Sequence, residues 1–220
     1  MAILVLDVGG THVKVRLQGR DEVRKCPSGP TMTPMEMIDK VRAATADWKF
    51  DRVTVGYPGP VVDGVIQRDP VNLGPGWLGF NFTAALGHPV KLINDAAMQA
   101  LGSYDGGRML FLGLGTGLGS ALVYNNFVIP MEIGHLPYKK GLTYEEYVGQ
   151  AGMKRLGRRK WQEAVFDVVE RFKNAFLSDY VVLGGGNVKK LDELPPSCRL
   201  GDNSNAFLGG LRLWENKPAQ

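Results

Sequence analysis

The sequence has few cysteines and no long apolar run. It contains only Cys26 and Cys198 among 220 residues, and they form no CxxC motif. A disulfide framework is therefore excluded, and two isolated thiols are typical of a reducing compartment such as the cytoplasm. No apolar stretch approaches the ~18 residues that a membrane-spanning helix needs. Because Asp7 interrupts the first apolar run, we also expect no secretory leader and no membrane partner.

The common glycine motifs of nucleotide-binding proteins are also missing. There is no Gly-Lys dipeptide, so the chain has no Walker A loop. The glycine-rich run at residues 113–119 does not fit GxGxxG. It is followed by a strand pattern, whereas a dinucleotide-binding turn is followed by a helix. The net charge of +4 permits an anionic ligand but does not require nucleic acid.

Glycine itself is abundant, with 29 residues against a usual share of about 7%. Two glycine turns lie between apolar, β-branched runs: DVGGT at residues 7–11 and GLGTGLG at residues 113–119. Each pattern predicts a β-hairpin. Glycine lets a ligand approach the backbone closely, and each threonine adds a hydroxyl, so each tip suits a phosphate oxygen. An ordinary tight turn is the alternative for either hairpin alone.

Strand and helix patterns alternate along the chain and predict an α/β protein. Strands are expected at residues 3–6, 13–17, 22–26, 52–56, 90–93 and 180–183. Helices are expected to begin after Thr33 and to cover residues 80–86, 96–101, 144–151, 161–176 and 205–214. We expect a first domain at residues 1–100, completed by a C-terminal helix at 205–220, and a second domain at 101–204.

A carboxylate at the end of one predicted strand is a candidate catalytic group. Asn94 and Asp95 follow the apolar strand at residues 90–93 and precede a helix pattern. Ligands bind at the carboxyl ends of strands in open α/β sheets, and a carboxylate there can take the proton of a substrate hydroxyl during phosphoryl transfer. The alternative is that Asp95 is simply the N-cap of the helix. Two glycine hairpins with this pair between them favour a kinase.

The segment MEIGHLP at residues 131–137 is a further candidate. Glu132 and His135 could hold a metal, although no third ligand follows at a suitable spacing. Recognition of neighbouring sugar hydroxyls fits this pair better, because both side chains form hydrogen bonds in a small cavity. A structural role for His135 remains the alternative.

Five motifs occur in the order found in the ROK family of sugar kinases and regulators, which this chain resembles over nearly its whole length. They are DVGGT (7–11), ND (94–95), GLGTGLG (113–119), EIGH (132–135) and GGG (184–186). The segments GHLPY (134–138), YEEYVG (144–149), KW (160–161) and GNVKK (186–190) look most like the polyphosphate glucokinase branch. The resemblance implies a two-lobed, ribonuclease H-like fold of the actin and hexokinase type, with mixed sheets flanked by helices. It also implies a homodimer.

The resemblance further implies a role for each matching residue. Asp7 would lie near Mg²⁺, and Asp95 would be the general base. Sugar-binding residues would be Asn72, Asn94, Asp95, Glu132 and His135, with Gly59 beside them and a further glutamate supplied by Glu145 or Glu146. Donor-phosphate residues would be Gly9, Gly10, Thr11, Lys14, Gly115, Thr116, Gly117, Gly184, Gly185 and Gly186.

Two departures from the family pattern narrow the interpretation. Residues 139–146 contain no cysteine, so we expect no zinc. The chain starts at the first strand, so we expect no DNA-binding helix-turn-helix ahead of it and no repressor function. The predicted activity is transfer of a phosphoryl group from polyphosphate, ATP or both to the 6-hydroxyl of glucose. The alternatives are another hexose, such as mannose, fructose or an N-acetylated aminosugar, and a sugar-binding sensor without catalysis.

Seven basic residues lie on the predicted donor side, at residues 154–160 and 189–190. Solvated helix faces explain such runs in many proteins. A groove that attracts a polyanion, such as polyphosphate, is the functional interpretation.

Overall fold

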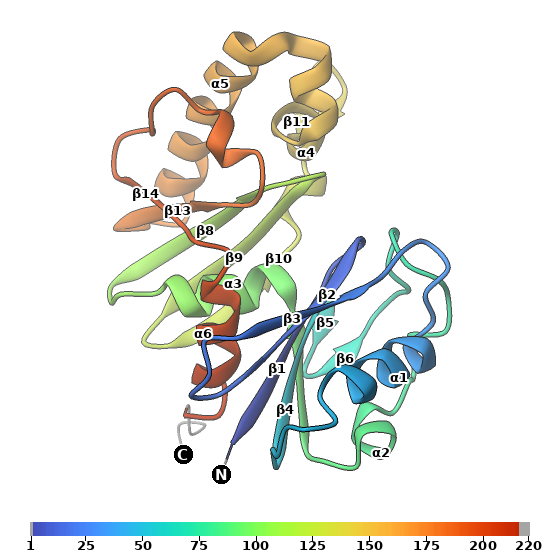
Figure 1. The fold of residues 1–220 in the computed structure, drawn as a ribbon. Helices are drawn as coiled ribbons and strands as arrows, with labels where there is room; N and C mark the ends of the chain where they lie inside the picture. The colour runs from blue at the N-terminus through green and yellow to red at the C-terminus, as the bar shows by residue number, and fades with distance from the viewer. Residues whose placement is uncertain (1, 216–220) are drawn as a thin grey trace. The chain divides into compact units, whose positions relative to one another are not determined.

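A computed structural model describes residues 2–215 of the chain. These residues form two compact units, one from the described parts of Met1–Met98 and Ala206–Gln220 and the other from Gln99–Asn205. Each unit contains one five-stranded mixed sheet with helices packed against it (Figure 1). In both sheets an antiparallel meander of three strands continues into two parallel strands, so the two units repeat one topology.

The first unit has the strand order β3-β2-β1-β4-β7 and a separate two-stranded ribbon, β5–β6. Its first glycine turn joins β1 to β2, as the sequence pattern predicts. The elements are β1 (Ile3–Val8), β2 (His12–Leu17), β3 (Val23–Pro27), α1 (Pro34–Ala44), β4 (Arg52–Tyr57), β5 (Val61–Val62), β6 (Val65–Ile66), α2 (Phe82–Leu86), β7 (Val90–Asn94), the start of α3 (Asp95–Ser103) and α6 (Asn205–Arg212).

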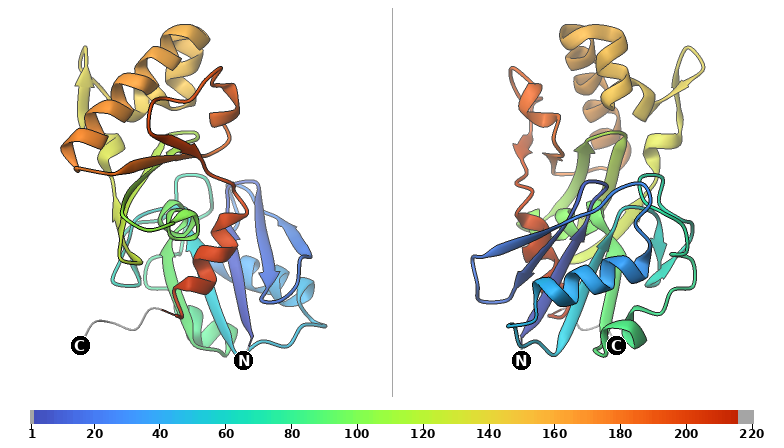
Figure 2. Two further views of the ribbon diagram at one scale, coloured as in Figure 1. Left: turned by 90° about the vertical axis from the view of Figure 1, so that its left-hand side faces the viewer. Right: turned by 45° about the vertical axis from the view of Figure 1, so that its right-hand side comes forward.

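Side chains along β1 point alternately to the two faces of this sheet. Leu4 and Leu6 belong to the apolar cluster that includes α1. Val5 faces the other way, toward α6, where a Cβ added to Gly210 would lie 2.4 Å from it. Figure 2 shows α1 and α6 on the two sides of this sheet. The same alternation places Asp7 on the Val5 face, away from the α1 cluster.

The second unit has the strand order β10-β9-β8-β13-β14 and a ribbon, β11–β12. Its glycine turn joins β8 to β9. The elements are β8 (Arg108–Leu114), β9 (Leu118–Tyr124), β10 (Phe127–Met131), η1 (Ile133–His135), β11 (Pro137–Lys139), β12 (Leu142–Thr143), α4 (Tyr144–Val148), α5 (Gln150–Ala175), β13 (Tyr180–Gly184), η2 (Val188–Lys190) and β14 (Cys198–Leu200).

The long helix α5 covers one face of the second sheet. Val165 and Val169 pack with Leu112 and Leu183 in one apolar cluster, and the fully buried Trp161 donates its indole N–H to the Val148 carbonyl at 2.8 Å. Each large side chain buried in this way stabilises the unit by about 1.5–3 kcal/mol.

Two helix starts follow from local capping chemistry. Thr33 with Glu36, and Thr143 with Glu146, form capping boxes at the starts of α1 and α4. The expected helix at residues 144–151 is wrong at its end, because Gly149 is extended and separates α4 from α5. A Cβ on Gly149 would lie 2.6 Å from two backbone carbonyl oxygens, so close packing requires glycine here.

Residues 152–160 lie outside the helices that the sequence predicts, and they are helical in the structure. Gly157 interrupts α5 with φ 75° and ψ 162°, values that glycine adopts without strain. The charged sequence around it hides the helical period that an apolar face would display. Among residues 2–215, no helix has both the length and the apolar character required to span a membrane.

Candidate functional site

The turn between β1 and β2 has its carbonyl oxygens tied to the protein. The Ser28 hydroxyl and N–H donate to the carbonyls of Gly9 and Thr11 at 2.6 and 3.0 Å, and Gly9 N–H donates to the His12 carbonyl at 3.0 Å. Within residues 2–215, the backbone N–H groups of Gly10 and Thr11 donate no hydrogen bond. N–H groups left unbonded at such a turn can bind an anion.

An ion pair lies at the base of this turn. Asp7 lies near the end of β1, opposite Lys14 on β2, and the Lys14 ammonium donates to the Asp7 carboxylate at 2.9 Å. The two side chains are partly buried, with 18% of Asp7 and 36% of Lys14 exposed. A carboxylate offers about four acceptor positions, so this pair leaves Asp7 able to accept a further donor or a cation.

Asn72 reaches the first turn from a distant loop. A Cβ added to Gly10 would lie 3.0 Å from the Asn72 Cβ, so glycine permits this close approach. The loop is held in place because the Asp69 carboxylate accepts from Trp77 N–H at 2.8 Å and Gly74 N–H donates to Met32 at 3.0 Å. The exposed Asn72 is thereby placed beside Gly10, whose N–H group is unbonded.

Asn94 caps α3, so the alternative that Asp95 is the N-cap is wrong. The Asn94 side-chain oxygen accepts from Ala97 N–H at 3.0 Å, and its amide donates to the Gly59 carbonyl at 3.0 Å. Asp95 is the first helical residue, and its carboxylate accepts from the N–H of Ala96 at 2.7 Å. It is partly exposed. Asn94 therefore provides the N-cap, and Asp95 bonds one further N–H group of the first helical turn.

The turn between β8 and β9 is tied down in the same manner as the first. The Asn187 side-chain amide donates to the Gly115 carbonyl at 2.7 Å. The N–H of Gln150, the first residue of α5, lies 3.1 Å from the carbonyls of both Gly115 and Thr116. In the described part of the chain, the N–H groups of Thr116 and Gly117 donate no hydrogen bond. Both turns therefore present unbonded backbone donors at their tips.

His135 lies between two carboxylates of the second unit. Its Nδ1 is 3.3 Å from Glu132 Oε2, and its Nε2 is 3.5 Å from Glu145 Oε1. Glu145 also lies over the second turn, since a Cβ on Gly117 would be 2.4 Å from Glu145 Oε2. The His135 and Glu132 side chains are about half exposed, and that of Glu145 is 33% exposed. They form a polar group with several donors and acceptors for ligand hydroxyls.

The structure distinguishes Glu145 from Glu146. Glu146 accepts from the N–H and hydroxyl of Thr143 at 2.7 and 2.9 Å, and these bonds hold the pKa of its carboxyl below the usual range. Glu146 is therefore occupied in capping α4, whereas Glu145 faces His135.

The glycines at residues 184–186 differ in what surrounds them. A Cβ on Gly184 would lie 2.6 Å from the Phe111 ring, and one on Gly185 would lie 2.4 Å from the Leu114 carbonyl oxygen. Packing against β8 therefore requires both glycines. Gly186 is exposed and has no neighbour within 4 Å of a built Cβ, so it leaves room for a ligand.

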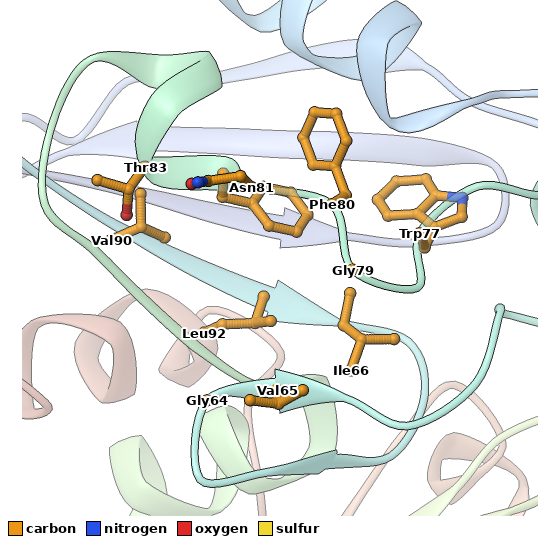
Figure 3. A pocket seen from close by; sticks show the side chains of 11 residues that line it. Gly64, Val65, Ile66, Trp77, Gly79, Phe80, Asn81, Thr83, Val90 and Leu92 are labelled. Carbon is orange, nitrogen blue, oxygen red and sulfur yellow. The ribbon is translucent and has the colours of Figure 1, made fainter.

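The rest of the described chain offers little further ligand chemistry. Within residues 2–215, no group of three or more His, Cys, Asp or Glu side chains is arranged to hold a metal ion. A cavity of about 330 Å³ lies in the first unit, between the β5–β6 ribbon, β7 and the loop before α2 (Figure 3). Most of its lining residues have apolar side chains, and none is charged or a candidate site residue: Gly64, Val65, Ile66, Trp77, Gly79, Phe80, Asn81, Phe82, Thr83, Val90 and Leu92.

Comparison with individual known proteins identifies the family, although no family model matches the chain. The polyphosphate glucokinase of Mycobacterium tuberculosis is 32% identical over 213 residues, which cover 87% of this chain and 80% of that protein. The chain belongs to the ROK family of sugar kinases.

Solved structures show that the chain has the ROK fold. The inorganic polyphosphate/ATP-glucomannokinase of Arthrobacter sp. strain KM matches with a TM-score of 0.81 and 23% identity, over 98% of this chain and 99% of that one. A ROK family glucokinase from Streptomyces griseus, in complex with glucose and AMPPNP, matches with a TM-score of 0.72 and 16% identity, over 97% and 99%. The expected fold, with mixed sheets flanked by helices as in actin and hexokinase, is confirmed.

Sequence reasoning missed the residues that fasten the two ROK glycine turns. Ser28 fastens the first turn, and Asn187 and Gln150 fasten the second. Asn187 directly follows the GGG run, which is a signal that could have found it. Ser28 and Gln150 carry no such signal, because their role depends on which backbone carbonyl the fold brings to them.

Proposed function

We propose that this ROK protein is a phosphotransferase that moves a phosphoryl group from polyphosphate, ATP or both to the 6-hydroxyl of glucose. The observation that carries the proposal is the 32% identity to a polyphosphate glucokinase over 87% of the chain. The two turns with unbonded N–H groups support it. Phosphoryl transfer depends on positioning and on stabilisation of phosphate charge, which such turns supply.

Asp95 is assigned the role of general base. Its position in the first turn of α3, with Asn94 providing the cap, leaves a partly exposed carboxylate to accept the proton of the 6-hydroxyl. The N-terminal end of a helix also favours a negatively charged group at this position. Asn94 and Asn72 are assigned to hold the sugar.

The residues around the first turn fit Mg²⁺. This ion usually takes one or two carboxylates and completes its octahedron with water and substrate phosphates. Asp7 supplies one hard oxygen donor at the base of the turn that carries the unbonded N–H groups, and Lys14 fixes its orientation. When bound, the ion would neutralise charge on the donor phosphates. Asp7 would hold it, in part through water, and Lys14, Gly9, Gly10 and Thr11 would bind phosphate oxygens.

The second unit supplies the remaining assigned residues. Glu132, His135 and Glu145 are assigned to sugar hydroxyls, because their mutual contacts fix their orientation and keep them partly exposed. The donor phosphates are assigned to the second turn and the glycine run that follows β13: Gly115, Thr116, Gly117, Gly184, Gly185 and Gly186.

We further place the enzyme in the cytoplasm as a homodimer without zinc. The family resemblance supports the dimer, and the two isolated cysteines support a reducing compartment. Light scattering on the purified protein, together with elemental analysis for zinc, tests the assembly and the metal content.

A coupled assay tests the proposed activity. Glucose, mannose, fructose and N-acetylmannosamine are each combined with ATP and with polyphosphate in the presence of Mg²⁺, and sugar phosphate formation is recorded. We expect the largest kcat/KM with glucose. Activity with neither donor on any hexose contradicts the proposal, and sugar binding by calorimetry without turnover would instead identify a sensor.

A further inference from the structure

The two basic segments of the second unit both start at its glycine turn. Gln150, the first residue of α5, contacts the carbonyls of Gly115 and Thr116 at 3.1 Å. Asn187 donates to Gly115 at 2.7 Å, and Lys190 N–H in turn donates to the Asn187 carbonyl at 2.9 Å. The cations that follow in α5 and η2 are therefore carried on elements fastened to one phosphate turn.

Arg158 joins these two segments at a distance from the turn. Its Nε donates to the Lys190 carbonyl at 2.8 Å, and its guanidinium pairs with Asp192. Gly157 makes the approach possible, because its left-handed backbone redirects α5 just before Arg158. The basic surface is defined as Lys154, Arg155, Arg158, Arg159, Lys160, Lys189 and Lys190.

Most of the positive charge on this basic surface is not compensated. Arg158 pairs with Asp192, Arg159 lies 3.8 Å from Glu163, and Lys189 acts on Asp202 only through its electrostatic field. Arg155 donates to a backbone carbonyl, that of Glu146 at 2.8 Å.

Lys154, Lys160 and Lys190 are exposed and make no ion pair with any residue in the range 2–215. On a solvated helix face, basic residues commonly have acidic residues four positions before or after them. These three lysines lack such partners in the structure, which favours an anionic ligand over a purely solubilising role.

We infer that the basic surface is a second donor subsite, which binds the phosphates of a polyphosphate chain beyond the one held at the Gly115–Gly117 turn. This inference rests on the proposed function. A chain of linked phosphates can contact the turn and the lysines together, whereas the triphosphate of ATP ends in a nucleoside and reaches fewer of them. The surface therefore acts on the affinity for long polyphosphate more than on ATP. Lysine suits this task, because its flexible stem carries a point charge to successive phosphates without fixed geometry.

The test uses the double variant Lys154→Gln/Lys190→Gln and a matched control, Lys49→Gln/Lys140→Gln. Each variant loses two exposed lysines that have no ion pair in the described chain. The Kd of long-chain polyphosphate is measured by calorimetry without sugar over a series of KCl concentrations, and KM is measured for polyphosphate and for ATP.

We expect the double variant to bind long polyphosphate about tenfold more weakly at moderate salt, while the control binds as the unaltered chain does. The slope of log K against log salt should flatten by about 1.4, at about 0.7 for each lost phosphate contact. KM for ATP should change less than twofold. Lys154→Arg/Lys190→Arg should restore binding, since it restores the charge.

The outcomes separate the inference from the proposed function. Equal polyphosphate affinity and equal salt slope in the double variant and the control overturn the inference while kinase activity stands. Absence of polyphosphate binding by the unaltered chain overturns it as well. Salt-dependent binding that the double variant weakens, in a protein that phosphorylates no hexose, supports the subsite and contradicts the kinase.

Discussion

The two glycine turns are built alike and equipped differently. Each closes an antiparallel hairpin, has carbonyl oxygens tied to the protein, and presents N–H groups at the tip. The first has the Asp7–Lys14 ion pair at its base and the amide of Asn72 against its tip. The second has Glu145 against its tip and two basic segments starting from it. The two turns thus share one backbone conformation pattern but differ in the side chains that surround them.

The largest expected effect is the loss of activity when Asp95, the acid of the first unit, is replaced. Asp95→Asn should lower kcat by ~10²–10⁴, because a general base of this kind contributes that much to proton transfer. The Tm should stay near that of the unaltered chain, since Asn94 provides the helix cap. Steady-state kinetics and thermal unfolding are the measurements. A rate close to normal would remove Asp95 from the role.

The second prediction compares two glycines at the second turn. Gly149→Ala places a Cβ 2.6 Å from the carbonyl oxygens of Glu145 and Thr116, so the backbone must shift. We expect a loss of about 1–3 kcal/mol in the free energy of unfolding and a raised KM for the donor. Denaturant unfolding measures the first effect.

Gly115→Ala is the control for that substitution. No atom lies within 4 Å of a Cβ built there, so stability should change by less than about 0.5 kcal/mol. Equal stability losses in the two variants would contradict the view that contacts at Gly149 hold the turn in place.

The third prediction concerns the polar group over the second turn. Glu132→Gln and Glu145→Gln should each raise KM for the sugar by about tenfold with a smaller change in kcat, because they remove one charge-assisted hydrogen bond. Glu146→Gln should leave KM for the sugar unchanged and lower only the Tm, since Glu146 caps α4. A KM effect at Glu146 in place of Glu145 would reverse the assignment.

The smallest expected effect is a pH dependence of the second unit. Burial raises the pKa of Asp167, but hydrogen bonds from Arg171, Tyr138 and Lys139 outweigh it and hold the pKa well below its ordinary value of 3.8. A lowered pKa in the folded state means that the carboxylate stabilises the protein above pH ~4, and that this stabilisation is lost as the pH falls below it.

Asp167→Asn should therefore lower the Tm by a few degrees at pH 7 and by less at pH 3, since a partly exposed ion pair is worth about 1 kcal/mol or less. Thermal unfolding at the two pH values is the measurement. Asp47→Asn is the comparison variant from the first unit. Hydrogen bonds from Arg24 lower the pKa of the Asp47 carboxyl to about 2, so its Tm loss should also be smaller at pH 3 than at pH 7. An equal Tm loss for Asp167→Asn at both pH values would contradict a lowered pKa of Asp167 in the folded protein.

Much of the fold could be predicted from the sequence. The hairpins, β4, β7, β13 and the start of α1 follow from apolar runs and capping residues that act locally. The short strands β5, β6, β11, β12 and β14 could not be predicted, because two or three residues carry no periodic signal. The start of α5 escapes prediction because its first turns are charged and its glycine at 157 resembles a breaker.

The candidate site divides in the same way. Asp7, Asp95 and the glycines of both turns stand out, because a glycine run indicates a turn and an acid near the end of a strand pattern indicates a ligand site, whatever lies elsewhere in the sequence. The residues that fasten the turns, Ser28, Asn187 and Gln150, do not stand out in this way, because each bonds a backbone carbonyl far away in the sequence.

The sequence by itself determined the order of the motifs, the two hairpins and the residue types available for phosphate chemistry, since these depend on local backbone preference and side-chain alternation. Only the tertiary structure decided that Asn94 caps α3 in place of Asp95, that Glu145 and not Glu146 faces His135, and that Arg158 meets the loop of Lys190. Each of these depends on distances between groups that folding sets, and chain order alone does not specify such distances.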